Sequence, residues 1–255
     1  IQGLIKSQGI DFYREDMNGD GACPSWRAND APDRQGITEN FYVQGHLAYW
    51  DALRAMNPKL RIDSCASGGR RDDLETMRRA VPLIRSDYLF EPTSQQCQQY
   101  GFAAWIPYSG AGYVVGHSAI GFNLPSEINR YVFRSEMSVA LTLSYDMRDK
   151  DLDYKLARLL YQQLRQVAPN YLGDFYPLTP YSLSNNVWMA WQYDRPESGE
   201  GMVQAFRRPD CHFESAQFKL HGLNVKAKYI VTNLDHPDQP KTLTGEELGK
   251  SGVLI

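Results

Sequence analysis

The sequence lacks the patterns that mark several common classes of protein. Its four cysteines, Cys23, Cys65, Cys97 and Cys211, form no C-x-x-C pair, which argues against a disulfide framework or a zinc knuckle. The five histidines include no H-E-x-x-H spacing, and no apolar run approaches the ~20 residues that span a bilayer. The net charge is only -3, which gives no reason to expect nucleic acid or an anionic membrane as a partner.

Aromatic residues are the abundant feature. The 255 residues include 16 Tyr and 5 Trp, many of them beside Gly, Asn, Asp or Gln. Amphipathic rings next to short polar groups suit sugar binding, although core packing explains most such rings by default. The length allows one large domain or two smaller ones.

Short apolar runs alternate with helical patterns over the first two-thirds of the chain. Repeated strand–loop–helix units of this kind predict a parallel sheet and an α/β fold. The predicted strands are 9–13, 60–63, 81–86, 111–115 and 140–145, and the predicted helices are 39–56, 70–80, 93–101, 125–140 and 152–167.

The pattern of residues changes after about Asn170. Short strand-like pieces follow, separated by Gly, Pro, Asp and Asn, and this pattern predicts an antiparallel β module. The pieces are 186–193, 199–208, 214–223 and 226–234. We therefore expect an α/β domain over residues 1–175 and an antiparallel β-sandwich over residues 176–255.

The stretch "REDMNGDGACPSW" has two interpretations. From Asp16 to Gly21 it reads D-x-N-x-D-G, like the front of a calcium loop, but position twelve of that loop is Arg27, which cannot ligate a cation. The alternative is a strand that ends by presenting the Asp16 carboxylate. Arg14 then supplies a neighbouring positive charge, which favours an ionised nucleophile.

Two further strand ends carry polar groups that suit the same kind of site. Asp87 follows the predicted strand 81–86. The segment "DSCASGGRRDD", which lies between Asp16 and Asp87 in the sequence, contains Ser67 and the pair Gly68–Gly69. Glycines allow a backbone to approach a ligand closely. Barrel enzymes carry their chemistry where strands end, so acid, glycine-rich loop and acid at three consecutive ends indicate a catalytic site.

These three segments resemble motifs of glycoside hydrolase family 36, the α-galactosidases and their relatives. "FYREDMN" resembles the family's K-W-D-M-N, "CASGGRRDDLE" is similar to its C-S-S-G-G-G-R-F-D-L, and "IRSDY" is similar to its W-S-D. The motifs fall in the family's order. The resemblance implies the later strands of a (β/α)8 barrel followed by a C-terminal β domain.

The resemblance also implies roles for individual residues. Asp16 matches the family's nucleophile and Asp87 its acid/base. Arg14 stands where the family has a Lys that contacts the sugar, while Cys65, Ser67 and Gly68 fall in its substrate-contacting loop.

Further expectations concern individual residues. Trp26 is a candidate for stacking on a sugar face, with core or loop packing as the alternative. Glu15, where the family has Trp, is expected to add negative charge beside the nucleophile. Asp63 is expected to be a strand or loop acid, and Asp72 and Asp73 to be charges at the start of the following helix.

The implied reaction is hydrolysis of a terminal α-galactoside of an oligosaccharide by double displacement, with no metal or organic cofactor. Two alternatives remain. One is an α-galactosyl transferase of the raffinose-synthase type, and the other is a non-catalytic sugar-binding remnant.

The length of the α/β region bears on the remnant. A (β/α)8 barrel takes ~250 residues, which is more than this region supplies, so we expect a partial barrel from a longer protein. Such a barrel has unpaired strand edges and is expected to form a homo-oligomer or to pair with a missing N-terminal segment.

Overall fold

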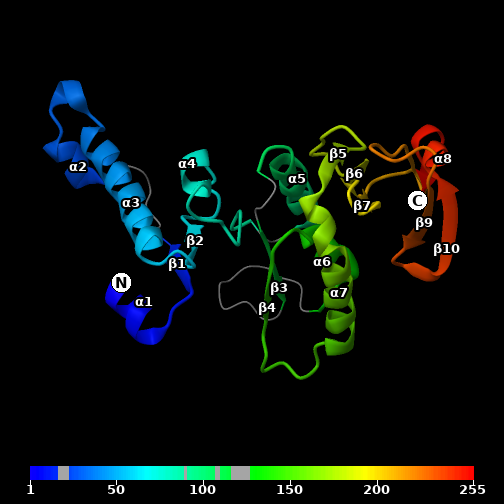
Figure 1. Ribbon diagram of the computed structural model, residues 1–255, viewed down its shortest axis with the longest axis horizontal. Coiled ribbons are helices and arrows are strands. Elements are labelled where there is room, and N and C mark those ends of the chain that lie inside the picture. Colours follow the sequence, from blue (N-terminus) through cyan, green and yellow to red (C-terminus); the bar gives the residue numbers. More distant parts are fainter. Residues whose placement is uncertain (17–22, 89–90, 107–109, 116–126) are drawn as a thin grey trace. The chain divides into compact units, whose positions relative to one another are not determined.

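The computed structural model describes residues 1–16, 23–88, 91–106, 110–115 and 127–255 (Figure 1). These residues form two compact units, Ile1–Asp87 and Tyr88–Ile255, which we call unit 1 and unit 2. The domain boundary predicted between residues 175 and 176 is not tested by this division and stays a prediction.

Unit 1 is built on one parallel strand pair, β1–β2. The register pairs Asp16 with Cys65, the last residues of the two strands, so both strands end at the same edge. The elements of unit 1 are α1 (Gln2–Gln8), β1 (Phe12–Asp16), α2 (Pro24–Asn29), η1 (Pro32–Arg34), α3 (Ile37–Met56), β2 (Arg61–Cys65) and α4 (Leu74–Met77).

The long helix α3 confirms the helix predicted over 39–56. It begins after Gly36 and ends before Asn57, which precedes Pro58, a residue that disfavours helix at its predecessor. Trp50 and Leu53 are its buried residues. They pack in the apolar core of unit 1 with Ile5, Leu60, Ile62 and Ala80.

The prediction of a strand over 81–86 is wrong. The structure has only a single bridge between Asp63 and Val81 in this segment. Pro82 has no backbone N–H to continue a ladder. The next N–H, that of Leu83, donates to Asp63 Oδ1 at 2.9 Å, so a side chain replaces the strand partner.

The helix predicted over 70–80 is shorter in the structure, because it begins at Leu74 and ends at Met77. Asp73 is its N-cap and accepts from the Thr76 N–H at 2.9 Å. The expectation that Asp73 starts this helix is therefore confirmed, and residues 70–72 belong to the loop before it.

Unit 2 contains a second parallel pair followed by antiparallel strands, and Figure 1 shows β3 and β4 side by side. Its helical elements are α5 (Pro92–Ala103), α6 (Arg130–Glu136), α7 (Tyr154–Val167), η2 (Ala168–Leu172) and α8 (Gly245–Lys250). Its strands are β3 (Ala111–Val115), β4 (Leu141–Tyr145), β5 (Asp174–Pro177), β6 (Trp188–Arg195), β7 (Glu200–Arg207), β8 (Gln217–Phe218), β9 (Lys228–Asn233), β10 (His236–Thr244) and β11 (Val253–Leu254).

The antiparallel pairing predicted after residue 170 is confirmed. The strands pair as β5–β6–β7, β9–β10 and β8–β11, all antiparallel. The strand predicted over 214–223 is reduced to the two residues of β8. A sandwich of these sheets stays a prediction.

The amphipathic helix α7 covers the main core of unit 2. Asp153 caps its N-terminus by accepting from the Leu156 N–H at 2.8 Å. Leu160 and Leu164 are buried on its inner face. This core includes aromatic and sulfur-containing side chains from α6, β3, β6 and β7, namely Phe133, Tyr113, Met189, Trp191 and Phe206.

We expect Leu160→Ala to lower the free energy of unfolding by about 2–5 kcal/mol, because Leu160 is fully buried and its truncation leaves a cavity. The matched control is Leu159→Ala, one residue earlier on the same helix and 40% exposed. It should cost less than about 1 kcal/mol. Urea unfolding of the two variants checks this, and equal losses would contradict the assignment of the inner face.

Candidate active site

The three motif segments meet around the thiol of Cys65, at the edge where β1 and β2 end. Asp16 is the register partner of Cys65 across the parallel pair. The backbone N–H of Gly68 hydrogen-bonds the Cys65 thiol. Gly68 in turn lies against the backbone of Ser86 and Asp87. The structure therefore brings one residue of each motif into a single cluster within unit 1.

The influences on the pKa of the Cys65 thiol are consistent with this cluster. Burial raises the pKa of its thiol, the Gly68 N–H and Arg14 lower it, and Asp16 and Asp87 raise it. The net pKa is raised, so Cys65 stays a neutral thiol at pH 7. Since both carboxylates act on the same sulfur, Asp16 and Asp87 both lie near Cys65.

The glycine loop approaches Asp87 too closely for any side chain. A Cβ atom added to Gly68 would lie 2.5 Å from the backbone nitrogen of Asp87 and 2.8 Å from Cα of Ser86. Gly68 also has φ of 73°, and the exposed Ser67 before it has φ of 47°. Two successive left-handed residues make a tight loop, in which only glycine fits at position 68.

Arg14 lies between the candidate nucleophile and a buried acid. One guanidinium nitrogen is 3.4 Å from Asp16 Oδ2, and another bonds Asp63 Oδ2. Partial burial lowers the pKa of Arg14, but the hydrogen bond to Asp63 and the charges of Asp63, Cys65 and Asp16 together raise it more, and the net pKa is raised. Asp63 is itself buried on β2 and is a structural acid, as its place in a strand indicates. Arg14 is thereby fixed as a cation beside Asp16.

The side chain of Glu15 points away from that of Asp16, so the expectation of added negative charge beside the Asp16 carboxylate is wrong. Successive side chains of a strand point to opposite faces. Asp16 is exposed, whereas Glu15 is buried and faces α3. There it accepts hydrogen bonds from the Tyr13 hydroxyl at 2.9 Å and from Trp50 Nε1 at 3.0 Å.

His46, which none of the sequence motifs indicated, also contacts Glu15. Its Nδ1 is 3.2 Å from Glu15 Oε1, and its Nε2 is 2.6 Å from a guanidinium nitrogen of Arg71. A signal was available, because Tyr42, His46 and Trp50 recur every four residues and so share one face of the predicted helix.

Trp26 has an aromatic partner on α3. Its ring lies 4.9 Å from that of Tyr42, centroid to centroid, in a tilted arrangement. Within the described ranges no hydrogen bond or ring contact joins Trp26 to Asp16, Cys65 or Asp87. A role for Trp26 in sugar binding stays a prediction, as do the roles of the other candidate site residues.

Some expectations fall outside the described residues. Most of the calcium-like loop, residues 17–21, lies there. Among the residues that the structure does describe, no group of three His, Cys, Asp or Glu is placed to hold a metal ion. No helix of this described part has the length and apolar character needed to cross a bilayer.

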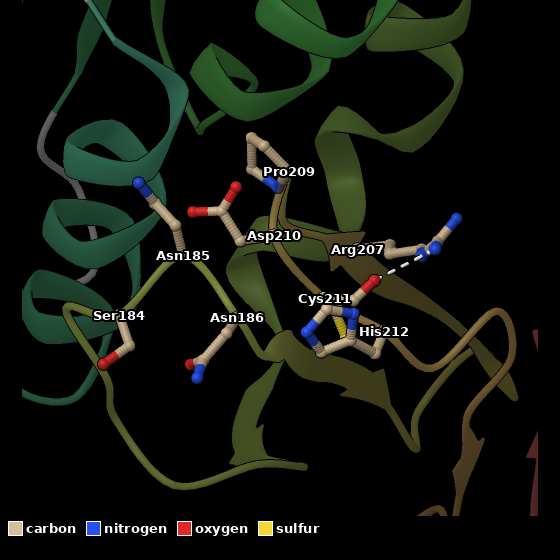
Figure 2. Close-up of a pocket in the computed structure, with 8 residues that line it drawn as sticks. All are labelled: Ser184, Asn185, Asn186, Arg207, Pro209, Asp210, Cys211 and His212. Atoms are coloured by element: carbon tan, nitrogen blue, oxygen red, sulfur yellow. Dashed lines mark hydrogen bonds between the residues drawn. The ribbon is translucent and has the colours of Figure 1, made fainter.

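A polar depression lies in unit 2, whereas the motif cluster belongs to unit 1. Figure 2 shows it between two loops, with Arg207 donating to the Cys211 carbonyl oxygen at 2.9 Å. All its lining residues except Cys211 are exposed. They are Ser184, Asn185, Asn186, Arg207, Pro209, Asp210, Cys211 and His212.

Asp72, in the loop after the glycines, is partly buried, and both of its carboxyl oxygens are shielded from solvent. Burial raises its pKa to about 6, a shift that Arg85 reduces and Asp73 increases. Neither carboxyl oxygen has a hydrogen-bond partner among the described residues. The sequence suggested a helix-terminus charge here, but Asp73 caps α4 and Asp72 lies beneath Gly69, where an added Cβ would be 2.8 Å from Asp72 Oδ2.

The loop geometry predicts a large cost for a methyl group at position 68. We expect Gly68→Ala to lower the free energy of unfolding of unit 1 by at least about 2 kcal/mol, because it combines left-handed strain with overlap on the Asp87 backbone. Gly45→Ala, in the middle of α3 with open space around it, should instead stabilise by about 0.5–1 kcal/mol. Thermal unfolding of both variants decides; a harmless Gly68→Ala would contradict the close approach.

The raised pKa of Asp72 predicts a pH-dependent effect on stability. A carboxyl whose folded pKa is about 6 stabilises the fold below its unfolded value near 4, and this contribution is lost as pH rises through 6. Asp72→Asn should therefore raise the free energy of unfolding at pH 7–8, by up to about 3 kcal/mol, and change little at pH 4. Asp73→Asn keeps a good N-cap and should have a small effect at either pH. A benefit of Asp72→Asn that did not decline towards pH 4 would refute this account.

Comparison with known proteins places these motifs in context. No protein-family model matches the chain. The curated relatives include α-galactosidase 1 of Pediococcus pentosaceus, 27% identical over 235 residues that cover 90% of this chain and 31% of that protein. The α-galactosidase of Escherichia coli is 23% identical over 293 aligned residues, covering 99% of this chain and 37% of that protein.

The fold matches solved structures of the same kind. The GH36 α-galactosidase AgaB of Geobacillus stearothermophilus superposes with a TM-score of 0.77 at 20% identity, covering 99% of this chain and 34% of that one. A structure of AgaA from the same organism, in complex with stachyose, gives a TM-score of 0.79 at 21% identity and covers 100% and 34% of the two chains. The α/β fold with a following β region is therefore shown.

The chain spans about a third of the length of the curated relatives it matches. The resemblance to the α-galactosidases of glycoside hydrolase family 36, inferred from the three motifs, is confirmed by these relatives.

Proposed function

We propose that this chain carries the two catalytic carboxylates of a retaining α-galactosidase. The observation that supports the proposal is the cluster around Cys65. Strand register sets Asp16 opposite this residue, and the glycine loop that starts from it backs onto Asp87. Two acids at neighbouring chain segments, with a cation beside one of them, are what a double displacement at a sugar requires.

In the first step Asp16 attacks the anomeric carbon from the face opposite the leaving group, and Asp87 donates a proton to the glycosidic oxygen. A covalent glycosyl–aspartate forms as the glycosidic bond breaks. In the second step Asp87 takes a proton from water, which attacks the same carbon and releases the sugar with its α configuration retained. This mechanism requires carboxyl groups ~5–5.5 Å apart.

Arg14 supplies the charge compensation for this mechanism. Its guanidinium is 3.4 Å from Asp16 and is held by the buried Asp63. We propose that it contacts a sugar hydroxyl next to the anomeric carbon. A guanidinium offers a planar fork of donors, unlike the compact ammonium of the lysine that the family has here.

The loop residues have proposed roles in holding the sugar. The backbone bend at Ser67 and Gly68 exposes the Ser67 side chain at the strand edge. We propose that this hydroxyl, the thiol of Cys65 and the Gly68 backbone contact the sugar, and that Trp26 covers one of its faces.

We further propose that the two parallel pairs belong to one (β/α)8 barrel. Both pairs are joined by helices, α3 between β1 and β2 and α6 between β3 and β4, as βαβ units of such a barrel are. The described residues supply two parallel pairs, and we propose that the other strands of the barrel come from further segments or from a second copy of the chain.

The proposed substrates are oligosaccharides with a terminal α-galactose. Structures of AgaA contain stachyose in one case and raffinose in another. The transferase alternative uses the same two acids and differs only in what attacks the glycosyl intermediate, so it is an outcome of the same experiments.

We expect a 2-deoxy-2-fluoro-α-galactosyl reagent with an activated leaving group to label the peptide that carries Asp16, because fluorine slows hydrolysis of the glycosyl intermediate. Mass spectrometry and peptide mapping locate the label. Asp16→Ala should abolish labelling, whereas the exposed acid Asp33, changed to Asn, should leave it unaltered. Labelling of another acid would overturn the nucleophile, and a folded chain without label or turnover would contradict the proposal.

Azide then separates the two carboxylates by stereochemistry. Asp87→Ala should slow hydrolysis of an unactivated α-galactoside by about 10²–10⁴-fold, the usual contribution of a general acid. With added azide it should form α-galactosyl azide, because azide attacks the intermediate on Asp16. In Asp16→Ala, azide replaces the nucleophile and should give β-galactosyl azide. Product analysis with added acceptor sugars distinguishes hydrolase from transferase.

A further inference from the structure

A buried polar network lies behind the candidate nucleophile, on the opposite face of β1. Glu15 is its centre, and it accepts from Tyr13 and Trp50 on Oε2, while His46 Nδ1 is 3.2 Å from Oε1. The side chains of Glu15 and His46 are each only 9% exposed. A carboxylate buried to this degree needs several donors, and this one has three.

The contact with Arg71 determines which nitrogen of His46 carries the proton. A guanidinium nitrogen of Arg71 is 2.6 Å from His46 Nε2. Arginine has only donors and keeps its charge, so Nε2 must be the acceptor and carries no proton. The imidazole is then neutral with its proton on Nδ1, from which it donates to Glu15.

This arrangement connects two segments of the candidate site. Glu15 is the residue before Asp16 at the end of β1, and Arg71 follows the glycine loop by two residues. His46 lies on α3 between them. We propose that His46 is a positioning residue, whose Nδ1–H tautomer ties the strand that carries Asp16 to the loop that packs against Asp87. The proposal rests on the proposed function, because the reaction requires these two acids at a set separation.

The same geometry makes the contact between His46 and Arg71 sensitive to acid. Protonation of His46 places a proton on Nε2, opposite the donor of Arg71, and the two then repel. The charged groups that face the ring are Glu15 from β1 and Arg71 from the loop before α4. From α3 itself the rings of Tyr42 and Trp50 pack on it, with ring centroids 6.2 and 4.4 Å from that of His46.

These neighbours set the pH at which the contact between His46 and Arg71 is lost. Burial lowers the pKa of His46, Glu15 raises it and Arg71 lowers it, and the net pKa is lowered. The neutral form therefore persists at pH 7, and the contact of neutral His46 with Arg71 is lost only when the pH falls below the ordinary pKa of histidine.

The tautomer is tested by long-range proton–nitrogen correlation spectra of the chain, which show which ring nitrogen is protonated. We expect His46 to be neutral with its proton on Nδ1 at pH 7. His212, His221 and His236 are exposed and serve as internal references in the same spectrum. A His46 ring that is protonated at pH 7, or neutral with its proton on Nε2, overturns the proposal whether or not the chain is an enzyme.

The positioning role is tested by whether the two segments respond together. On acidification the backbone amide signals of Asp16 and Gly69 should shift with the midpoint of the His46 ring. His46→Gln keeps an acceptor for Arg71 but does not titrate, so both shifts should disappear in that variant. His236→Gln, on exposed β10, should leave them unchanged. Amide signals that ignore the His46 titration would refute the coupling.

Activity adds a readout that a merely structural role would not move. In the wild type, kcat for an aryl α-galactoside should fall about tenfold or more below the His46 midpoint with little change in KM, since displaced reacting groups lose rate rather than binding. His46→Gln should remove that acidic limb. An unchanged limb overturns the positioning role. Absent turnover in a chain whose His46 spectrum is as expected refutes the proposed function instead.

Discussion

The arrangement of the candidate site depends on one close approach, that of the Gly68 backbone to Ser86 and Asp87. The distance from an added Cβ to the Asp87 nitrogen would be only 2.5 Å, so the two backbones touch with no side chain between them. Left-handed φ at Ser67 and Gly68 turns the chain sharply enough to permit this. The loop starts at Cys65, which the β1–β2 register ties to Asp16. The contact thus relates one candidate acid to the other through a short path of backbone.

Successive side chains of β1 point to opposite faces, so the candidate site residues lie on one face and the residues that contact α3 lie on the other. Arg14 and Asp16 share one face and are partly exposed, with the positive charge beside the carboxylate. Tyr13 and Glu15 share the other and join α3 through hydrogen bonds. The buried Asp63 on β2 belongs to the first group, because it hydrogen-bonds Arg14 from the side away from solvent. A five-residue strand therefore carries both the candidate nucleophile and contacts that fix the position of the strand.

Much of this arrangement was predictable from local sequence. The spacing of apolar residues in α3, the break at Asn57–Pro58 and the alternating strands and helices indicated the elements, and polar residues at the strand ends indicated the site. The segment 81–86 was misjudged because apolar composition alone does not show that Pro82 lacks a donor for the ladder and that Asp63 takes the next N–H. The partner of Arg14 and the burial of Asp72 depend on tertiary packing, which no local pattern contains.

The two departures from the family motif in β1 have different physical consequences. Arginine in place of lysine at position 14 has donors enough to contact Asp16 and Asp63 together, so the cation is held from two sides. Glutamate in place of tryptophan at position 15 puts a charge where the family has an apolar ring. A buried charge is tolerated only with donors around it, and Tyr13, Trp50 and His46 supply them. His46 in turn needs an acceptor role on its other nitrogen, which Arg71 uses. The glutamate at position 15 therefore requires a matched set of neighbours, and through His46 this set contacts Arg71, which follows the glycine loop.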